Sequence, residues 1–311
     1  MQLSIVVGTY NRLEQLKACV NSVLAEIRTP FVLYVTDAGS TDGTTDYLQS
    51  IASEQIRPVL VGSRIGQARA YNEVFDQVTT PYVCWISDDN VIVNAGLDIA
   101  TRVLDKNPRI GMVGLKVRDL QGPFTDAPYI GGISKIGILN VNQGVLRTEL
   151  LKDVGGFSYA FKDYGIDPDL TAKVLFSGWE IALTRDVAIH HYRNWSTDKS
   201  SSEYAEMQRR QEQYLALYRA KYSAFDQREP TWLAKKAFWR ILQKLAPERL
   251  HINSKKSILG AFPRDWHNVL NGRYISLLDT FWTLGKDYHL VQRCPKRALP
   301  SELPREIEIV R

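Results

Sequence analysis

A short apolar run that ends on two adjacent carboxylates constrains this chain more than any other feature. Tyr82 to Ile86 combines β-branched and aromatic residues after Pro81, which predicts a buried strand. Asp88 and Asp89 follow, and adjacent carboxylates at the end of a buried strand need a cation or several donors nearby. Ligands of open α/β sheets bind outside the carboxyl ends of strands, so a hard divalent ion that holds a diphosphate suits this position. The alternative is a solvated strand-to-turn junction, where Asp and Asn are common.

The residues before this run alternate between strand and helix patterns. Short β-branched runs predict strands at 4–7, 31–36 and 59–62, and helical spacing follows at 13–24, 45–53 and 64–72. Strands that alternate with helices at this spacing predict an α/β fold with a mostly parallel sheet and helices on both faces. The loops after the first, second and fourth strands should lie on one edge of that sheet. This edge carries Thr9, Asn11, Asp37, Asp42, Asp88 and Asp89.

Several motifs in this order resemble the GT-A glycosyltransferases, in particular the large inverting family often called family 2. The matching motifs of the first half are GTYNR (8–12), TDAGSTDGT (36–44), residues 64–72 and ISDDN (86–90). In the second half a Gly-Gly-Phe turn (155–157) precedes an acidic pair, Asp167 and Asp169, near a helix start, and late short strands are expected at 181–184 and 187–190. The resemblance covers roughly residues 3 to 195 and implies a Rossmann-like GT-A fold.

The resemblance also implies a metal site. The family's acidic motif commonly reads Asp-x-Asp, and this sequence departs from it because Ser87 stands at the first position. Asp89 aligns with the usual metal ligand, and His190 is the second expected ligand of a Mn²⁺ or Mg²⁺ ion. Asp88 would take over part of the role of the missing first carboxylate. The alternative for His190 is a packed or solvated histidine, and strand alternation turns only one residue of the pair His190-His191 inward.

Asp167 aligns with the family's catalytic acid and is the expected general base, which must reach the acceptor hydroxyl. Asp169 is the alternative base, or it caps the helix. Asp37 is expected at the base edge of the nucleotide, and an Asx-turn before Gly39 is the alternative. The remaining expected contacts with the nucleotide sugar come from Thr9, Tyr10, Asn11, Arg12, Gly66, Arg69 and Asp88.

The implied function is inverting, metal-assisted transfer of a sugar from a nucleotide diphosphate, first a UDP-sugar, to a glycan or lipid-linked glycan in polysaccharide biosynthesis. One rival is a catalytically silent nucleotide-sugar-binding protein of a polysaccharide assembly complex, which the Ser87 departure leaves open. A second rival, a sugar-nucleotide nucleotidyltransferase, should carry a Gly-rich basic phosphate loop, which GTYNR is not. A third, nucleic-acid binding by the basic tail, lacks a recognisable module.

Charge and composition divide the chain. Its 311 residues are 44% hydrophobic and 23% charged, which is typical of a globular protein with a sizeable core. The net charge is +9 for residues 199–311 and −4 for residues 1–198. We expect a catalytic domain at 1–222 and a basic, mainly helical extension at 223–311. Three widely spaced cysteines and a first strand without a preceding leader pattern favour the cytoplasm.

Two helices are predicted in the basic tail before a less regular end. Residues 201–222 indicate one long polar helix, and the apolar residues four apart in 231–245 predict a basic amphipathic helix. The second helix either lies peripherally on an anionic membrane surface or packs on the catalytic domain or a second subunit of a homo-oligomer. Further helices are expected near 254–259 and 271–285, and residues 293–311 are expected to be extended.

Overall fold

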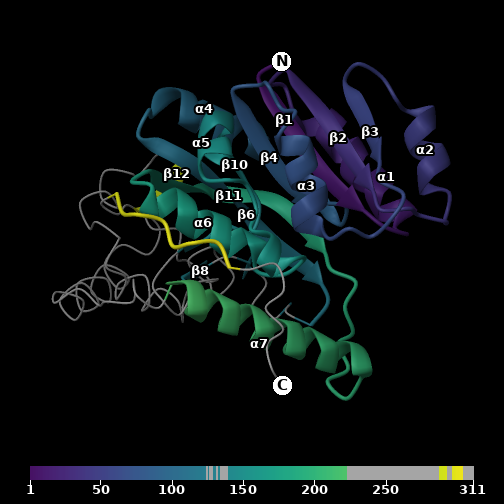
Figure 1. Cartoon of the computed structure of the whole chain (residues 1–311). Helices are drawn as coiled ribbons and strands as arrows, with labels where there is room; N and C mark the ends of the chain where they lie inside the picture. The colour runs from purple at the N-terminus through teal and green to yellow at the C-terminus, as the bar shows by residue number, and fades with distance from the viewer. Residues whose placement is uncertain are drawn as a thin grey trace, which may run out of the picture.

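The computed structural model describes residues 1–123, 125, 129–130, 132–133, 139–222, 287–292 and 296–303, whose arrangement is shown in Figure 1. The first half contains β1 (Leu3–Thr9), α1 (Leu13–Glu26), β2 (Phe31–Asp37), α2 (Thr44–Ser50), β3 (Ile56–Leu60), α3 (Gln67–Phe75), β4 (Tyr82–Ser87), β5 (Asn90–Ile92), α4 (Gly96–Lys106) and β6 (Ile110–Gln121). The second half contains β7 (Tyr129–Ile130), β8 (Gly132–Ile133), β9 (Leu139–Asn140), β10 (Gly144–Arg147), α5 (Thr148–Asp153), a 3₁₀ helix (Tyr159–Phe161), α6 (Ile166–Phe176), β11 (Glu180–Tyr192), α7 (Ser202–Tyr222) and β12 (Tyr288–Gln292).

One mixed sheet joins most of these strands in the order β12-β11-β6-β10-β4-β1-β2-β3, with β5 paired to β11 and β7 to β6. The four strands β4, β1, β2 and β3 are parallel, as predicted, and each is connected to the next along the chain by a helix. β10 is antiparallel to both β4 and β6, while β11 runs parallel to β6. The carboxyl ends of β1, β2 and β4 therefore meet at one edge of the sheet.

Alternating strand residues fill two apolar cores, one on each face of the sheet. Val6 and Trp85 belong to one cluster, while their neighbours Ile5 and Cys84 belong to the other, because successive strand residues point to opposite faces. Residues of α3, α5, α6 and α7 complete the first cluster, and residues of α1, α2 and α4 complete the second. The fold is thus three layers, helix–sheet–helix, as the alternation of patterns predicts.

Two strand boundaries differ from the prediction for identifiable reasons. β3 begins at Ile56 rather than at residue 59, and it tolerates Pro58 because it pairs with β2 at the edge of the sheet. The late strands expected at 181–184 and 187–190 are one continuous strand, β11, whose register against β6 shifts between Leu183 and Val187. These register shifts determine which side chains at the end of β11 point toward the edge formed by the carboxyl ends of β1, β2 and β4.

The described segments beyond residue 222 pack against the strands and helices that precede them. β12 extends the sheet beside β11, and the N–H of Arg297 donates to the carbonyl of Phe176 at the end of α6, at 2.8 Å. Figure 1 shows the segment 296–303 running alongside α6. The predicted helices at 231–245, 254–259 and 271–285 lie outside the described residues, and the domain boundary at residue 222 stays a prediction.

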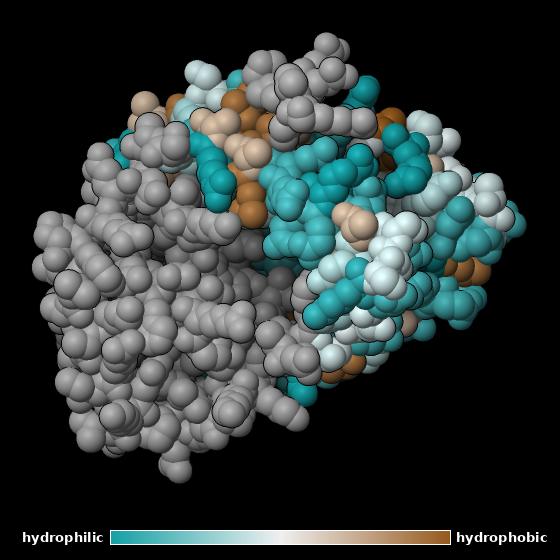
Figure 2. All heavy atoms as spheres, turned by 90° about the horizontal axis from the view of Figure 1, so that it is seen from below, coloured by the Kyte–Doolittle hydropathy of each residue, from teal (hydrophilic) through white to brown (hydrophobic). Residues whose placement is uncertain are grey.

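The long polar helix expected at 201–222 is confirmed as α7, which lies below α6 in Figure 1. Seen from that side, the described surface is mainly hydrophilic, with apolar residues in small separate patches (Figure 2). Among the helices of the described ranges, none combines the length and apolar character that crossing a membrane requires.

Candidate active site

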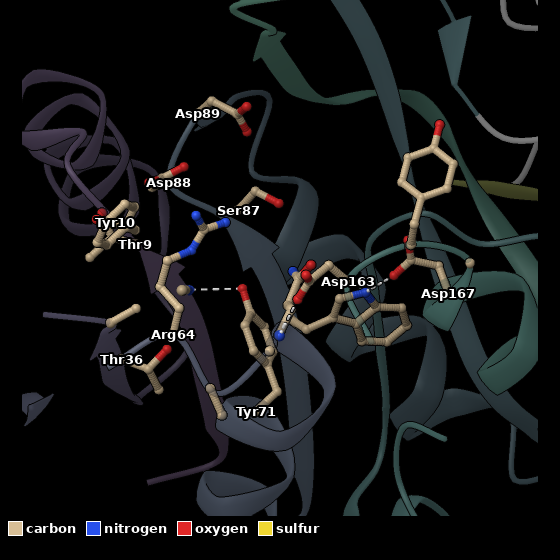
Figure 3. A pocket seen from close by; sticks show the side chains of 18 of the residues that line it. Thr9, Tyr10, Thr36, Arg64, Tyr71, Ser87, Asp88, Asp89, Asp163 and Asp167 are labelled. Atoms are coloured by element: carbon tan, nitrogen blue, oxygen red, sulfur yellow. Dashed lines mark hydrogen bonds between the residues drawn. The ribbon is translucent and has the colours of Figure 1, made fainter. Parts of the chain in front are cut away.

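A cavity of about 1010 Å³ lies at the sheet edge where the sequence predicts the site. Its floor comes from the ends of β1, β2 and β4, and its far wall comes from the start of α6 and from α7. Figure 3 shows the acidic pair Asp88 and Asp89 on one side of the cavity and Asp167 on the other. A single cavity thus contains the predicted metal-binding carboxylate and the predicted general base.

The acidic pair is buried and shares a cation supplied by the chain. A terminal nitrogen of Arg12 lies 3.1 Å from Asp88 and 3.2 Å from Asp89. Burial raises the pKa of Asp88 to about 6, although the charge of Arg12 opposes this shift. The pair does not form the exposed junction that the sequence left open, because both residues are at most 8% exposed. The side-chain oxygen of Asn90 accepts a hydrogen bond from the N–H of Ser87, at 3.0 Å, and so closes the turn that presents both carboxylates.

His191, rather than His190, faces Asp89, which corrects the predicted choice within the pair. Nε2 of His191 lies 3.1 Å from Asp89 Oδ1, and Nδ1 lies 2.8 Å from Asp119 Oδ1. The contact arises because β5 pairs with β11 so that His191 is opposite Asn90, the residue after Asp89. Burial lowers the pKa of His191, but its hydrogen bonds to Asp119 and Asp89 outweigh this effect and raise it. His190 points to the other face, where burial and the charge of Arg118 lower its pKa.

Asp167 is held by two donors from the sheet side of the cavity. Nε1 of Trp85 donates to Oδ1 at 2.8 Å, and Nδ2 of Asn142 donates to Oδ2 at 3.1 Å. Burial raises the pKa of Asp167 to about 7, while the two hydrogen bonds act in the opposite direction. A carboxylate with a pKa near neutrality suits a general base.

Asp169, the alternative base, points away from the cavity into a buried ionic cluster. Its oxygens accept from the hydroxyls of Ser158 and of Tyr222, the latter at 2.7 Å, and lie 2.9 Å from Nζ of Lys221. Lys173 lies 3.9 Å away on the same helix. This carboxylate is fully buried and is not among the residues that line the cavity, so its position suits anchoring of α6 rather than contact with a substrate.

A family model with the description Glycosyl transferase family 2 matches residues 4–161, which is about half of the chain. The chain belongs to glycosyl transferase family 2. Within the matched range lie the acidic turn and the loops after β1 and β2. An uncharacterized glycosyltransferase of Nostoc sp. is 32% identical over 94 residues, a match that spans 29% of this chain and 29% of the length of that relative.

Solved glycosyltransferase structures share the fold of this family 2 chain. A mannosyltransferase from Pyrobaculum calidifontis, solved in complex with GDP-Man and Mn²⁺, superposes with a TM-score of 0.54 at 20% identity. The superposition covers 86% of this chain and 73% of the mannosyltransferase chain. TarS 1-349 of S. aureus, in complex with UDP-GlcNAc, gives 0.51 at 19% identity and covers 87% and 90%. These similarities confirm the predicted GT-A fold.

Two side chains at the acidic turn of this family 2 chain have a spacing that fits two ligands of a divalent ion. Oδ1 of Asp89 and Nε2 of His191 are 3.1 Å apart. Adjacent ligands of an octahedral ion, each about 2.1 Å from the metal, are about 3 Å apart. Asp119 holds the other ring nitrogen of His191, as carboxylates commonly do for metal-bound histidines. Within the described ranges, no group of three or more His, Cys, Asp or Glu side chains is arranged around a common point. Mg²⁺ usually takes one or two carboxylates together with substrate phosphates, so a small protein ligand set is compatible with this chemistry.

Two residues predicted to contact the nucleotide, Asp37 and Asn11, make hydrogen bonds within the loops after β1 and β2. The carboxylate of Asp37 accepts from the hydroxyls of Ser40, at 2.5 Å, and of Thr45, at 2.9 Å, which is the local turn that the sequence left as the alternative. Asn11 adopts a positive φ of 51° and accepts from the N–H of Thr41 at 2.7 Å. Neither side chain lines the cavity, and the geometry assigns them to joining the loops after β1 and β2.

Arg69, which was also predicted to contact the nucleotide, does not line the cavity. It is exposed on α3 and pairs with Glu73 at 3.1 Å, one turn along the helix. Arg64, three residues before α3, enters the cavity instead, and its guanidinium lies 4.9 Å from the ring centre of Tyr10 (Figure 3). Among the other predicted contacts, Thr9, Tyr10, Arg12, Gly66 and Asp88 line the cavity, and their contact with a nucleotide sugar stays a prediction.

Sequence reasoning missed the residues that hold the site in shape. The hydroxyl of Tyr71 accepts from the N–H of Gly8 at 2.8 Å and donates to the carbonyl of Ile86 at 2.7 Å. It therefore joins β1 to β4 at the points where both strands reach the cavity. Trp85 carries the hydrogen bond to Asp167 from within β4. The only available signal was that both are large residues with a polar atom in apolar segments, where that atom needs a partner.

Proposed function

We propose that this chain is an inverting glycosyltransferase that uses a nucleotide-diphosphate sugar, first a UDP-sugar, and a glycan or lipid-linked glycan as acceptor. The observation that carries the proposal is the cavity that contains the buried pair Asp88 and Asp89 near one end and Asp167 at the other. The likeness to proteins solved with GDP-Man and with UDP-GlcNAc supports a nucleotide-sugar donor.

The loops after β1 and β2 suit the nucleotide. Thr9, Tyr10 and Arg64 line that end of the cavity, and the cation of Arg64 over the ring of Tyr10 gives a flat, positively charged surface. Gly66 precedes α3 with a φ of 89°, and a Cβ added there would lie 3.5 Å from Oδ1 of Asp163, which also lines the cavity. The donor diphosphate would then extend toward Arg12 and the acidic turn.

Asp89 and His191 are the residues that would hold a Mn²⁺ or Mg²⁺ ion, with Asp88 beside them. When bound, such an ion supplies positive charge to a leaving diphosphate. Asp119 orients His191 and fixes which ring nitrogen faces the acidic pair. Arg12 provides positive charge at the same place from the chain itself.

Asp167 is proposed as the general base of a single displacement. The acceptor oxygen attacks the anomeric carbon, its proton passes to Asp167, and the bond from that carbon to the diphosphate oxygen breaks with its electron pair on the diphosphate. Attack from the side opposite the leaving group inverts the anomeric configuration. Trp85 and Asn142 hold the carboxylate in one orientation, so one oxygen lone pair stays directed at the cavity.

The first test measures thermal shifts with UDP, dTDP and GDP, each with and without Mn²⁺. Stabilisation by one nucleotide supports the donor site, and no stabilisation by any of the three counts against it. Sugar release from the matching nucleotide sugars is then measured for Asp167→Asn, which should lose about 10²–10⁴-fold in turnover. Asp163→Asn is the matched control: it also lines the cavity, its oxygen accepts from the N–H of Gln67, and an amide oxygen can still accept there.

A catalytically silent nucleotide-sugar-binding protein is the second candidate, because Arg12 already supplies one positive charge to an acidic pair that lacks the family's first acid at Ser87. The same variants separate the two candidates. A binding protein would show a nucleotide-induced thermal shift but no turnover that depends on Asp167. A cytoplasmic location, membrane contact through residues 231–245 and assembly into a homo-oligomer are further parts of this proposal, and those residues lie outside the described ranges.

A further inference from the structure

Beyond the donor end and Asp167, the cavity has a wall of aromatic side chains that the proposed chemistry does not use. Tyr164, Trp195 and Tyr214 line the cavity together and come from the loop before α6, the segment after β11 and the middle of α7. The ring centres of Tyr164 and Trp195 are 6.3 Å apart with an angle of 32° between the planes. Tyr214 meets Tyr164 edge to face at 6.0 Å. Three remote segments thus build one aromatic surface.

This surface is only partly integrated into the apolar core. Tyr218 and Tyr222, the next tyrosines on the same side of α7, are buried core residues. Tyr164 and Trp195 belong to neither core cluster and are only partly buried, and Tyr214 is partly buried against the core. Core packing therefore explains the tyrosines at the C-terminal end of α7. The three rings at the cavity, in contrast, keep part of their surface open to the cavity.

The aromatic surface is fixed relative to Asp167. Tyr164 stands three residues before Asp167, and Gly165 between them has a φ of 86°. The ring of Tyr214 packs directly on this glycine, since a Cβ added there would lie 2.1 Å from Cδ2 of Tyr214. Trp195 is held from one side by Arg193, whose guanidinium lies 4.2 Å from the indole ring centre. A molecule lying on these rings would be held at a set distance from the proposed base.

From this geometry we infer that Tyr164, Trp195 and Tyr214 form the acceptor subsite and that the acceptor group is a pyranose ring, an inference that rests on the proposed function. A pyranose has one or two faces of C–H groups and a rim of hydroxyls. Its C–H faces suit aromatic rings, and its hydroxyls need polar partners at the edge of the subsite, as is common in sites with aromatic walls and few polar groups. Arg193 and Gln211 are polar residues that line the cavity beside these rings.

The experiment uses the full-length chain and methyl α- and β-pyranosides of glucose, galactose, mannose and N-acetylglucosamine as probes, because a methyl group adds no second ring. Saturation-transfer NMR, with the nucleotide that stabilises the protein present, reports which glycoside protons contact it. We expect transfer to the C–H protons of at least one ring. Trp195→Ala and Tyr164→Ala should weaken that binding about tenfold, the effect expected from exposing one C–H face. Trp195→Phe and Tyr164→Phe should retain most of it.

Tyr192→Ala is the matched control, because it removes an exposed aromatic ring close to Trp195 in sequence that does not line the cavity. Glycoside binding should be unchanged in this variant. Unchanged binding in both Trp195→Ala and Tyr164→Ala, or no saturation transfer to any of the glycosides, would overturn the inference. If Trp195→Ala instead abolishes the nucleotide-induced thermal shift, the rings stack on the nucleobase and the acceptor assignment is wrong. If no nucleotide binds, the proposed function fails, whereas glycoside binding that depends on Trp195 would still support the subsite.

Discussion

Trp85 and Asp167 are joined by a hydrogen bond of 2.8 Å from the indole N–H to a carboxylate oxygen. Trp85 lies in the middle of β4, whereas Asp167 lies in the first turn of α6, more than 80 residues later in the chain. Because the acidic turn follows β4 directly, the same strand presents Asp88 and Asp89 at its end and orients the proposed base from its side. The relative positions of the two chemical groups are therefore set by one buried strand.

This relationship predicts a shift in pH dependence for Trp85→Phe. The hydrogen bond from the indole favours the ionised form of Asp167 and lowers its pKa. Removal of the donor should raise the pKa further above about 7, so the acid limb of the profile of kcat/KM against pH should move to higher pH. Because a hydrogen bond to a charged group is worth about 1.5 kcal/mol, its loss should shift the acid limb by about one pH unit.

Trp179→Phe serves as the control for this profile, since Trp179 is partly buried against the same core but makes its ring contact with Arg147. Its acid limb should coincide with that of the wild type. An acid limb in Trp85→Phe that stays in place or moves to lower pH would show that Asp167 is not the group whose ionisation controls turnover.

The effect of Asp167→Asn on stability, measured relative to the wild type, should become more favourable as the pH rises. The folded pKa of Asp167 is raised to about 7 by burial, so the native state holds the proton more tightly than the unfolded chain, in which the pKa is about 4. Stability from this group is full below pH 4 and is lost as the pH rises through 7. The amide does not titrate, so the stability of the variant relative to wild type should increase by about 1–3 kcal/mol between pH 5 and pH 8.

Urea unfolding at pH 5, 6, 7 and 8 measures this difference, with Asp198→Asn as the control at an exposed carboxylate outside the cavity. The quantity of interest is the change in the mutational effect with pH, which is independent of any constant cost of the new amide. A difference that is flat over this range would contradict a raised pKa at Asp167.

The histidine pair illustrates how much of the site the sequence predicts. Strand alternation correctly requires that one of His190 and His191 faces the acidic turn. Which one does so depends on the register of β11, which shifts several times against β6, and on the short strand β5 that brings Asn90 opposite His191. These contacts join segments that are 72 (β6 and β11) and 101 (β5 and β11) residues apart, and local patterns carry no information about them.

The same distinction between local and remote contacts separates the other residues. The strand-and-helix order was predictable because it depends on local periodicity, and so was the common edge that carries Asp88 and Asp89. The sequence could not decide between the alternative roles of Asp37 and of Asp169, because each role depends on which donors the carboxylate contacts in the folded chain. For Asp37 these are Ser40 and Thr45 nearby, whereas for Asp169 they include Lys221, more than 50 residues away.

His191→Ala and His190→Ala form a matched pair for the metal site. Nε2 of His191 lies 3.1 Å from Asp89, whereas His190 lies on the opposite face of the same strand. Loss of a ligand should weaken Mn²⁺ binding by at least tenfold in His191→Ala, and His190→Ala should bind within about twofold of wild type. Mn²⁺ binding is measured by electron paramagnetic resonance of free Mn²⁺ with the preferred nucleotide present. Equal affinities in the two variants would remove His191 from the ligand set.

Lys221→Met should destabilise the protein strongly, although Lys221 lies on α7, far along the chain from the proposed base. Its ammonium lies 2.9 Å from Asp169 and 3.1 Å from Glu302, and its side chain is fully buried. Removal of one partner leaves Asp169 buried with less compensating charge, which costs about 3–5 kcal/mol for an isolated buried pair. Lys173, 3.9 Å from Asp169, retains part of the compensation, so we expect about 2–4 kcal/mol in urea unfolding.

The double variant Asp169→Asn with Lys221→Met tests the cause of that loss. Removal of both charges should recover part of the stability, because the cost arises from the unpaired carboxylate rather than from the lost side-chain volume. Arg69→Ala, which breaks the exposed pair with Glu73, should change stability by less than about 0.5 kcal/mol. If the double variant is as unstable as the sum of the two single variants, the cluster is held by packing and not by charge. The ionic link between α6, α7 and the segment 296–303 would then not be what fixes the helix that carries Asp167.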